Sequence, residues 1–105
     1  MIKVYHFPSN LFRYVPHGSA EKQAAFALQH FTKYKHVADV DTSTLNQAFR
    51  LTNSIDEHWS LNNGVKHYET SRSTSVGDVM EQDGKFYVVA SFGFAEIALD
   101  NKTTA

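Results

Sequence analysis

The sequence predicts one α+β domain in which two helices pack on one face of a mixed, largely antiparallel sheet with C-terminal hairpins. Three observations support this fold class. The chain has 105 residues, of which 42% are hydrophobic, so it can bury a single core without metal or disulfide cross-links. In the first half, apolar residues follow the period of a strand and then that of a helix, twice. The second half carries Asn63-Gly64 and Asp83-Gly84, dipeptides that favour two-residue hairpin turns. We assign one domain to residues 1–105 and expect residues 100–105 to fray.

The first strand and helix are separated by an irregular segment. Ile2 to Phe7 is rich in strand-forming residues and ends at a proline, which cannot donate to a sheet. Pro8 to Gly18 contains two prolines, a glycine and no period, so it is predicted to be a loop. Ser19 is a plausible N-cap for a helix that begins at Ala20 and ends near Phe31, because apolar residues there return at helical spacing.

A second strand and helix follow directly. Tyr34 to Val40 alternates between its two faces, as a strand does. Apolar residues then return at helical spacing from Leu45 to about Asn53. Thr44 and Gln47 have the spacing of a capping box, and Thr42 or Ser43 offers an earlier cap for this helix.

Two hairpins are expected after the second helix. An Asp83-Gly84 turn sets Val79 opposite Val88 in the flanking strands. An Asn63-Gly64 turn sets Trp59 opposite Tyr68. A last strand around Phe94 and Ile97 is expected to close the sheet.

Composition excludes several function classes. Ten basic and eleven acidic residues give a net charge of −1, so no long-range field gathers nucleic acid. No apolar run is long enough to span a bilayer, and the first residues lack the layout of a signal peptide. There is no cysteine, which fits a reducing compartment. We therefore expect a cytoplasmic protein with no nucleic acid or membrane partner.

No catalytic, metal or cofactor motif is found. Asp56, His58 and His67 are able to converge on zinc if the Asn63-Gly64 hairpin forms, but their spacing is not a metal motif and scattered surface histidines are favoured. The serines near Asp78 lack the glycine-flanked elbow of hydrolases. We therefore predict no catalytic residue, no metal and no cofactor.

Five polar or aromatic residues are better candidates for a binding site than these histidines and serines: Arg50, Asn53, Asp56, Trp59 and Arg72. Where the second helix ends, they form either the start of a recognition pocket with Trp59 as anchor or an internal network. In the network, Arg50 or Arg72 pairs with Asp56 or Asp78 and fixes the long connection to the sheet.

A second candidate surface lies in the segment from Pro8 to Gly18. Its apolar residues have no regular period, and the seven other phenylalanines of the chain and Trp59 already compete for a small interior. We predict that Phe12 or Tyr14 is exposed and is covered by a protein partner or by a second copy of the chain.

The C-terminal quarter resembles a known signature. Arg72 to Phe94 reads RSTSVGDVMEQDGKFYVVASFGF. This stretch and the following Ile97 resemble the C-terminal signature of YodL-like domains, small modules of plasmid, phage and integrative-element proteins. The matching residues are Ser73, Thr74, Ser75, Val76, Asp78, Val79, Tyr87, Val89, Ser91, Phe92, Gly93, Phe94 and Ile97. The resemblance implies a fold and a genetic setting, and it implies no reaction.

Together these observations favour a non-enzymatic protein–protein interaction or regulatory module encoded on a mobile genetic element. The alternative is a small-ligand-binding protein or minor enzyme that uses a pocket near Trp59.

Overall fold

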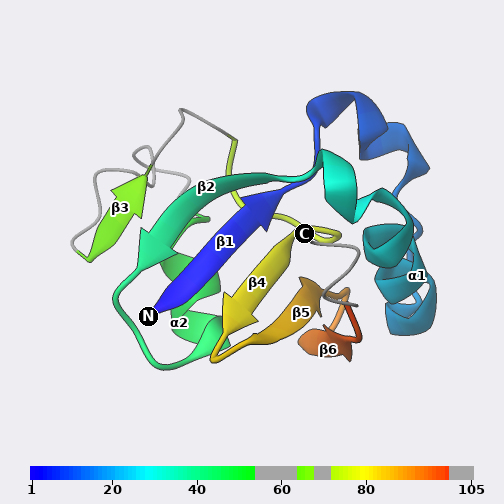
Figure 1. The fold of residues 1–105 in the computed structure, drawn as a ribbon. Helices are drawn as coiled ribbons and strands as arrows, with labels where there is room; N and C mark the ends of the chain where they lie inside the picture. The colour runs from blue at the N-terminus through cyan, green and yellow to red at the C-terminus, as the bar shows by residue number, and fades with distance from the viewer. Residues whose placement is uncertain (54–63, 68–71, 100–105) are drawn as a thin grey trace.

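The described residues form a six-stranded sheet whose strand order is β3-β2-β1-β4-β5-β6 (Figure 1). The computed structural model describes residues 1–53, 64–67 and 72–99. Its elements are β1 (Ile2–His6), the 3-10 helix η1 (Ser9–Tyr14), α1 (Ala20–His30), the 3-10 helix η2 (Phe31–Lys33), β2 (Lys35–Val40), α2 (Leu45–Leu51), β3 (Val65–His67), β4 (Val79–Gln82), β5 (Lys85–Val89) and β6 (Phe94–Ile97). The α+β class and the C-terminal hairpins are thus confirmed. Each described strand pair is antiparallel, whereas a mixed, largely antiparallel sheet was expected.

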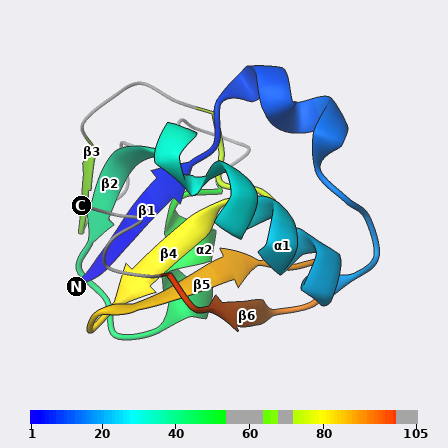
Figure 2. The same cartoon turned by 45° about the vertical axis from the view of Figure 1, so that its right-hand side comes forward.

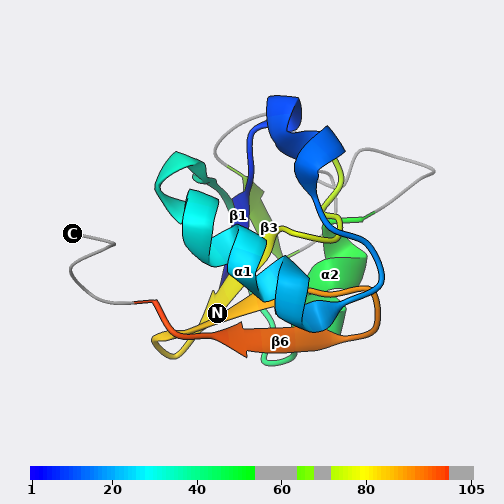
Figure 3. The same cartoon turned by 90° about the vertical axis from the view of Figure 1, so that its right-hand side faces the viewer.

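The two α-helices cover opposite faces of the sheet, whereas the sequence analysis placed both on one face. Val79 and Val88 pack with Ala27 of α1 on one side. Their neighbours Met80 and Val89 pack near α2 on the other side. Figures 2 and 3 show the sheet between the two helices. Adjacent apolar residues within one strand are typical of a sheet that is buried on both faces, and this feature of β4 and β5 explains the difference.

The local signals for helix starts and for one hairpin are confirmed. Ser19 caps α1 and accepts a hydrogen bond from the Lys22 backbone N. Thr44 caps α2 in the same way. In the β4–β5 hairpin Val79 lies opposite Val88, as the Asp-Gly turn predicts. Both turn residues have positive φ, 54° at Asp83 and 83° at Gly84.

The segment between β1 and α1 is not an irregular loop but contains η1. A 3-10 helix of six residues is uncommon, and its segment shows no regular apolar period from which it could be predicted. Leu11 supplies the buried contact of η1, while Phe12 and Tyr14 remain exposed. The second predicted hairpin is described only in part, because Trp59 and Tyr68 lie outside the described residues. Gly64 has positive φ, and β3 after it pairs with β2.

Within the described residues, the structure contains no helix whose length and apolar character would let it cross a membrane.

Candidate functional site

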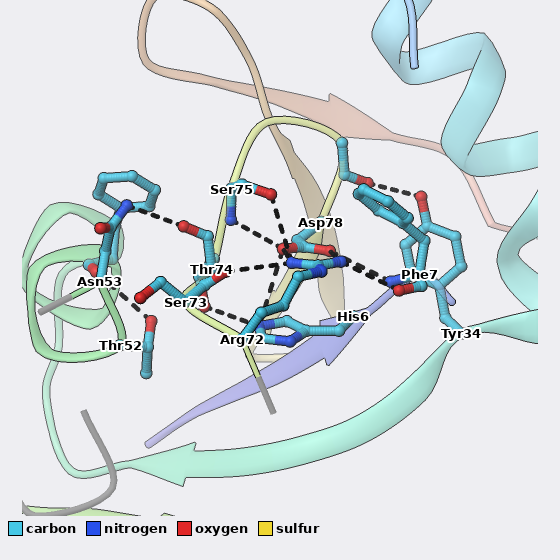
Figure 4. A network of polar contacts seen from close by, with 12 residues as sticks. His6, Phe7, Tyr34, Thr52, Asn53, Arg72, Ser73, Thr74, Ser75 and Asp78 are labelled. Carbon is cyan, nitrogen blue, oxygen red and sulfur yellow. Dashed lines mark hydrogen bonds and ion pairs between the residues drawn. The ribbon is translucent and has the colours of Figure 1, made fainter. Parts of the chain in front are cut away.

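Among the described residues, a dense polar cluster is centred on Asp78, which is fully buried just before β4 (Figure 4). Its two carboxylate oxygens accept four hydrogen bonds. Arg72 donates two of them, from Nη1 at 2.6 Å and from Nη2 at 2.8 Å. The backbone nitrogens of Ser75 and Phe7 donate the others, at 2.8 and 3.1 Å. The Arg72 fork also donates to the Phe7 carbonyl oxygen at 3.0 Å, so one ion pair joins the end of β1 to residues 72–78.

This cluster is the internal network that the sequence analysis considered, with Arg72 and Asp78 as the pair. Asn53 joins it from the end of α2, where its side-chain amide donates to the Thr74 carbonyl oxygen at 2.8 Å. Arg50 is exposed on α2. Asp56 and Trp59 lie outside the described residues, so the network is described without them.

His6 is a member of the cluster that sequence reasoning missed. It is 4% exposed, and its Nε2 lies 2.9 Å from Thr74 Oγ1 and 3.7 Å from Asp78 Oδ2. Burial, assisted by the Arg72 charge, lowers the pKa of His6 from 6.5 to about 3. At pH 7 His6 is therefore neutral and makes no ion pair with Asp78. A signal was present in the sequence, because His6 continues the buried alternation of Ile2 and Val4 with a polar residue.

Burial acts on Asp78 in the opposite direction. It raises the pKa of this carboxyl from 3.8 to about 6, although the Arg72 hydrogen bonds oppose the shift. Because the folded-state pKa is raised, the pH-dependent part of the stability that Asp78 contributes is full below pH 3.8 and is lost as the pH rises through about 6. The contribution of His6 has the other sign, because it is full above pH 6.5 and is lost as the pH falls toward 3. The two effects oppose each other in the window where both groups titrate.

A second cluster lies where β1 leads into η1. The ring of Phe12, in the second half of η1, meets the Phe7 ring edge to face at 5.1 Å. The Arg72 guanidinium carbon lies 4.3 Å from the centre of the Phe7 ring and 4.7 Å from that of Phe12. The buried ion pair therefore also supports an exposed aromatic side chain. Phe12 is 46% exposed and Tyr14 is 62% exposed, which confirms the prediction that at least one of them faces solvent.

The segment after η1 is held by Gln23 and Ser91, a pair that the sequence analysis did not identify. Gln23 is fully buried, and its amide donates to Ser91 Oγ at 2.8 Å and to the Pro16 carbonyl oxygen at 3.1 Å. The Ser91 backbone N donates back to Gln23 Oε1 at 3.1 Å, and the same hydroxyl accepts from Gly18 N at 3.3 Å. The available signal was a glutamine at a core-facing position of an amphipathic helix.

A groove of about 550 Å³ runs between η1 and α1. It is lined mainly by apolar atoms and a few polar side chains, from Leu11, Tyr14, Pro16, Lys22, Ala25, Phe26, Gln29 and His30. Tyr14 thus forms part of its wall, whereas Phe12 lies outside it. We call Phe12, Tyr14 and this groove the η1 surface.

The part of the chain that the structure describes contains no group of three or more histidine, aspartate or glutamate residues placed to hold a metal ion. Of the zinc candidates, His67 lies on β3 opposite Ala38, and Asp56 and His58 lie outside the described residues. Comparison with known proteins finds no matching family model, no significantly similar curated protein and no significantly similar solved structure.

Proposed function

We propose that this protein is a non-enzymatic, cytoplasmic protein–protein interaction module of a mobile genetic element, and that it binds its partner through the η1 surface. The observation that carries the proposal is the exposure of Phe12 and Tyr14 on a short helix that is fixed at both ends. Aromatic side chains dominate the binding energy of protein interfaces. Because η1 is ordered in the free protein, little conformational entropy remains to be lost on binding.

The polar clusters support the same reading. The carboxylate of Asp78 is fully buried and is satisfied by four donors, so it stabilises the fold around η1. Asn53 and Arg72, two candidates for a pocket near Trp59, are engaged with Thr74 and Asp78. Their engagement favours the interaction module over the alternative, a small-ligand pocket near Trp59. The mobile-element setting rests on the resemblance of residues 72–97 to YodL-like domains.

The proposal is tested by replacing the two exposed aromatic residues together. We expect Phe12→Ser with Tyr14→Ser to weaken partner binding by about thirtyfold or more, as for the loss of a hot spot. The fold is expected to persist at a cost of about 1 kcal/mol, because neither ring fills the core. Phe92→Ser is the matched control, since Phe92 is 94% exposed and does not line the groove.

The measurement is quantitative affinity capture from lysate of the native host, followed by mass spectrometry. A partner retained by the wild type and by Phe92→Ser, and lost from the double variant, supports the proposal. Identical capture by all three proteins contradicts it. A double variant that unfolds also contradicts it, because the rings would then belong to the core.

A further inference from the structure

We propose that the groove between η1 and α1 binds an acidic peptide segment of the partner, with an apolar side chain as its anchor. This inference rests on the proposed function and adds the chemistry of the partner. The shape of the groove, its charge and an unfavourable residue in α1 support this inference.

The groove follows one face of α1. Its α1 residues are Lys22, Ala25, Phe26, Gln29 and His30, which return every three or four positions over two helical turns. Two turns span about 12 Å, the length of a short peptide segment. Phe26 and Leu11 are nearly buried, whereas the small Ala25 side chain is exposed and leaves room for an incoming apolar group.

The charge of the groove is one-sided. Lys22 is exposed and lines it near the start of α1, and it is the one lysine or arginine among the described residues that line the groove. No carboxylate lines the groove within the described residues, and Glu21, the carboxylate in the first turn of α1, is outside it. A segment with negative charge is therefore electrostatically complementary to this groove, and a basic segment is repelled.

Lys22 is also an unfavourable residue for its position in α1. It stands three positions after the Ser19 cap, where a glutamate completes a capping box and where the helix dipole disfavours a cation. A lysine here therefore lowers the stability of α1. Residues that oppose local stability are expected at functional sites, and this lysine places its charge beside the groove.

A peptide fits the surface better than a small amphiphilic anion does. Phe12 does not line the groove, yet it is exposed on the same short helix as Tyr14. A small molecule confined to the groove would leave Phe12 uncovered. A partner segment with its own flanking chain is able to cover the groove and both aromatic rings.

The experiment measures binding of three fluorescein-labelled peptides by fluorescence anisotropy. Each peptide carries leucines one helical turn apart, embedded in glutamates, in glutamines or in lysines. We expect the glutamate peptide to bind most tightly and its affinity to fall as salt is raised, because the charges are exposed. Equal or tighter binding of the glutamine or lysine peptide overturns the inference.

Two pairs of variants locate the binding. Lys22→Glu is expected to weaken binding of the glutamate peptide about fivefold or more and to strengthen binding of the lysine peptide. Lys33→Glu makes the same charge change outside the groove and is expected to leave both affinities unchanged. Lys22→Glu completes the capping box, so lost binding is not explained by unfolding. Ala25→Leu fills the groove and is expected to weaken binding, while Ala20→Leu, outside it, does not. Unchanged binding by Lys22→Glu or by Ala25→Leu overturns the inference.

Two further results separate this inference from the proposed function. In the first, the protein binds decanoate but not the glutamate peptide, and Ala25→Leu blocks the decanoate binding. This result overturns the inference in favour of a small amphiphilic ligand. In the second, the double variant Phe12→Ser with Tyr14→Ser loses a captured partner that Lys22→Glu still binds as well as the wild type does. This result overturns only the inference of an acidic segment, and it still supports the interaction module.

Discussion

The buried ion pair between Arg72 and Asp78 makes a quantitative prediction about stability. Asp78→Asn keeps the shape of the side chain but removes its charge and replaces one acceptor oxygen with a donor NH₂ group. That group then faces N–H donors, because Arg72 Nη1 and the Ser75 nitrogen both lie within 2.8 Å of Asp78 Oδ2, and Oδ1 accepts from Arg72 and Phe7. Arg72→Met instead leaves a fully buried carboxylate without its cation.

The expected loss of stability is large because each change breaks an ion pair that is shielded from water. The side chain of Arg72 is 20% exposed and that of Asp78 is 0% exposed, so solvent compensates little for a lost partner. Each single change is expected to lower the free energy of unfolding by about 3–5 kcal/mol. The double variant is expected to lose much less than the sum, because no unpaired charge remains buried.

The assay is equilibrium unfolding in urea at pH 7, followed by circular dichroism, for the wild type, both single variants and the double variant. A coupling free energy of about 2 kcal/mol or more supports the argument. Additive losses, or a loss below about 1 kcal/mol for either single variant, would refute it, since the pair would then behave like an exposed one.

Three further predictions concern pH, backbone conformation and metal. Relative to the wild type, His6→Asn is expected to gain about 1.4 kcal/mol of stability per pH unit as the pH falls from about 6.5 toward 4. The reason is that His6 binds a proton in the unfolded wild type and excludes it in the folded protein. A stability difference that does not change with pH in urea titrations would contradict this. Gly77→Ala and Gly84→Ala both place alanine at positive φ, but only at Gly77 does the new Cβ meet a side chain, at 3.1 Å from Val15. We expect losses of about 1 kcal/mol at Gly84 and about 2–4 kcal/mol at Gly77, and equal thermal shifts would count against the contact argument. EDTA is expected to leave the melting temperature unchanged, because a core of this size folds without a metal, and a fall of several degrees would show otherwise.

The fold was predictable where local chemistry decides it. Helix caps depend on one side chain and a backbone donor three positions away, so Ser19 and Thr44 were among the candidate caps that the sequence alone provides. The register of the β4–β5 hairpin follows from the positive φ that Asp83-Gly84 adopts. The face on which each helix packs is a tertiary property, and the prediction for it was wrong.

The candidate site was predictable only in part, for the same reason. The sequence offered Arg72 and Asp78 as partners among several pairs, and only tertiary structure selects between them. His6 and Thr74 meet although they are 68 positions apart, so no spacing rule finds them. The exposure of Phe12 and Tyr14 followed from a volume argument, whereas the groove beside them depends on how η1 packs on α1.

The position of β1 in the middle of the sheet has a consequence for synthesis of the chain on the ribosome. β1 is made first, yet one of its two neighbours is β4, and its Phe7 nitrogen donates to a carboxylate 71 positions later. Until β4 has left the exit tunnel, β1 can pair with β2 but has an open edge on its other side. Contacts between residues so far apart in sequence slow folding. The chain is therefore most exposed to aggregation and to chaperone binding while only its N-terminal half has been synthesised.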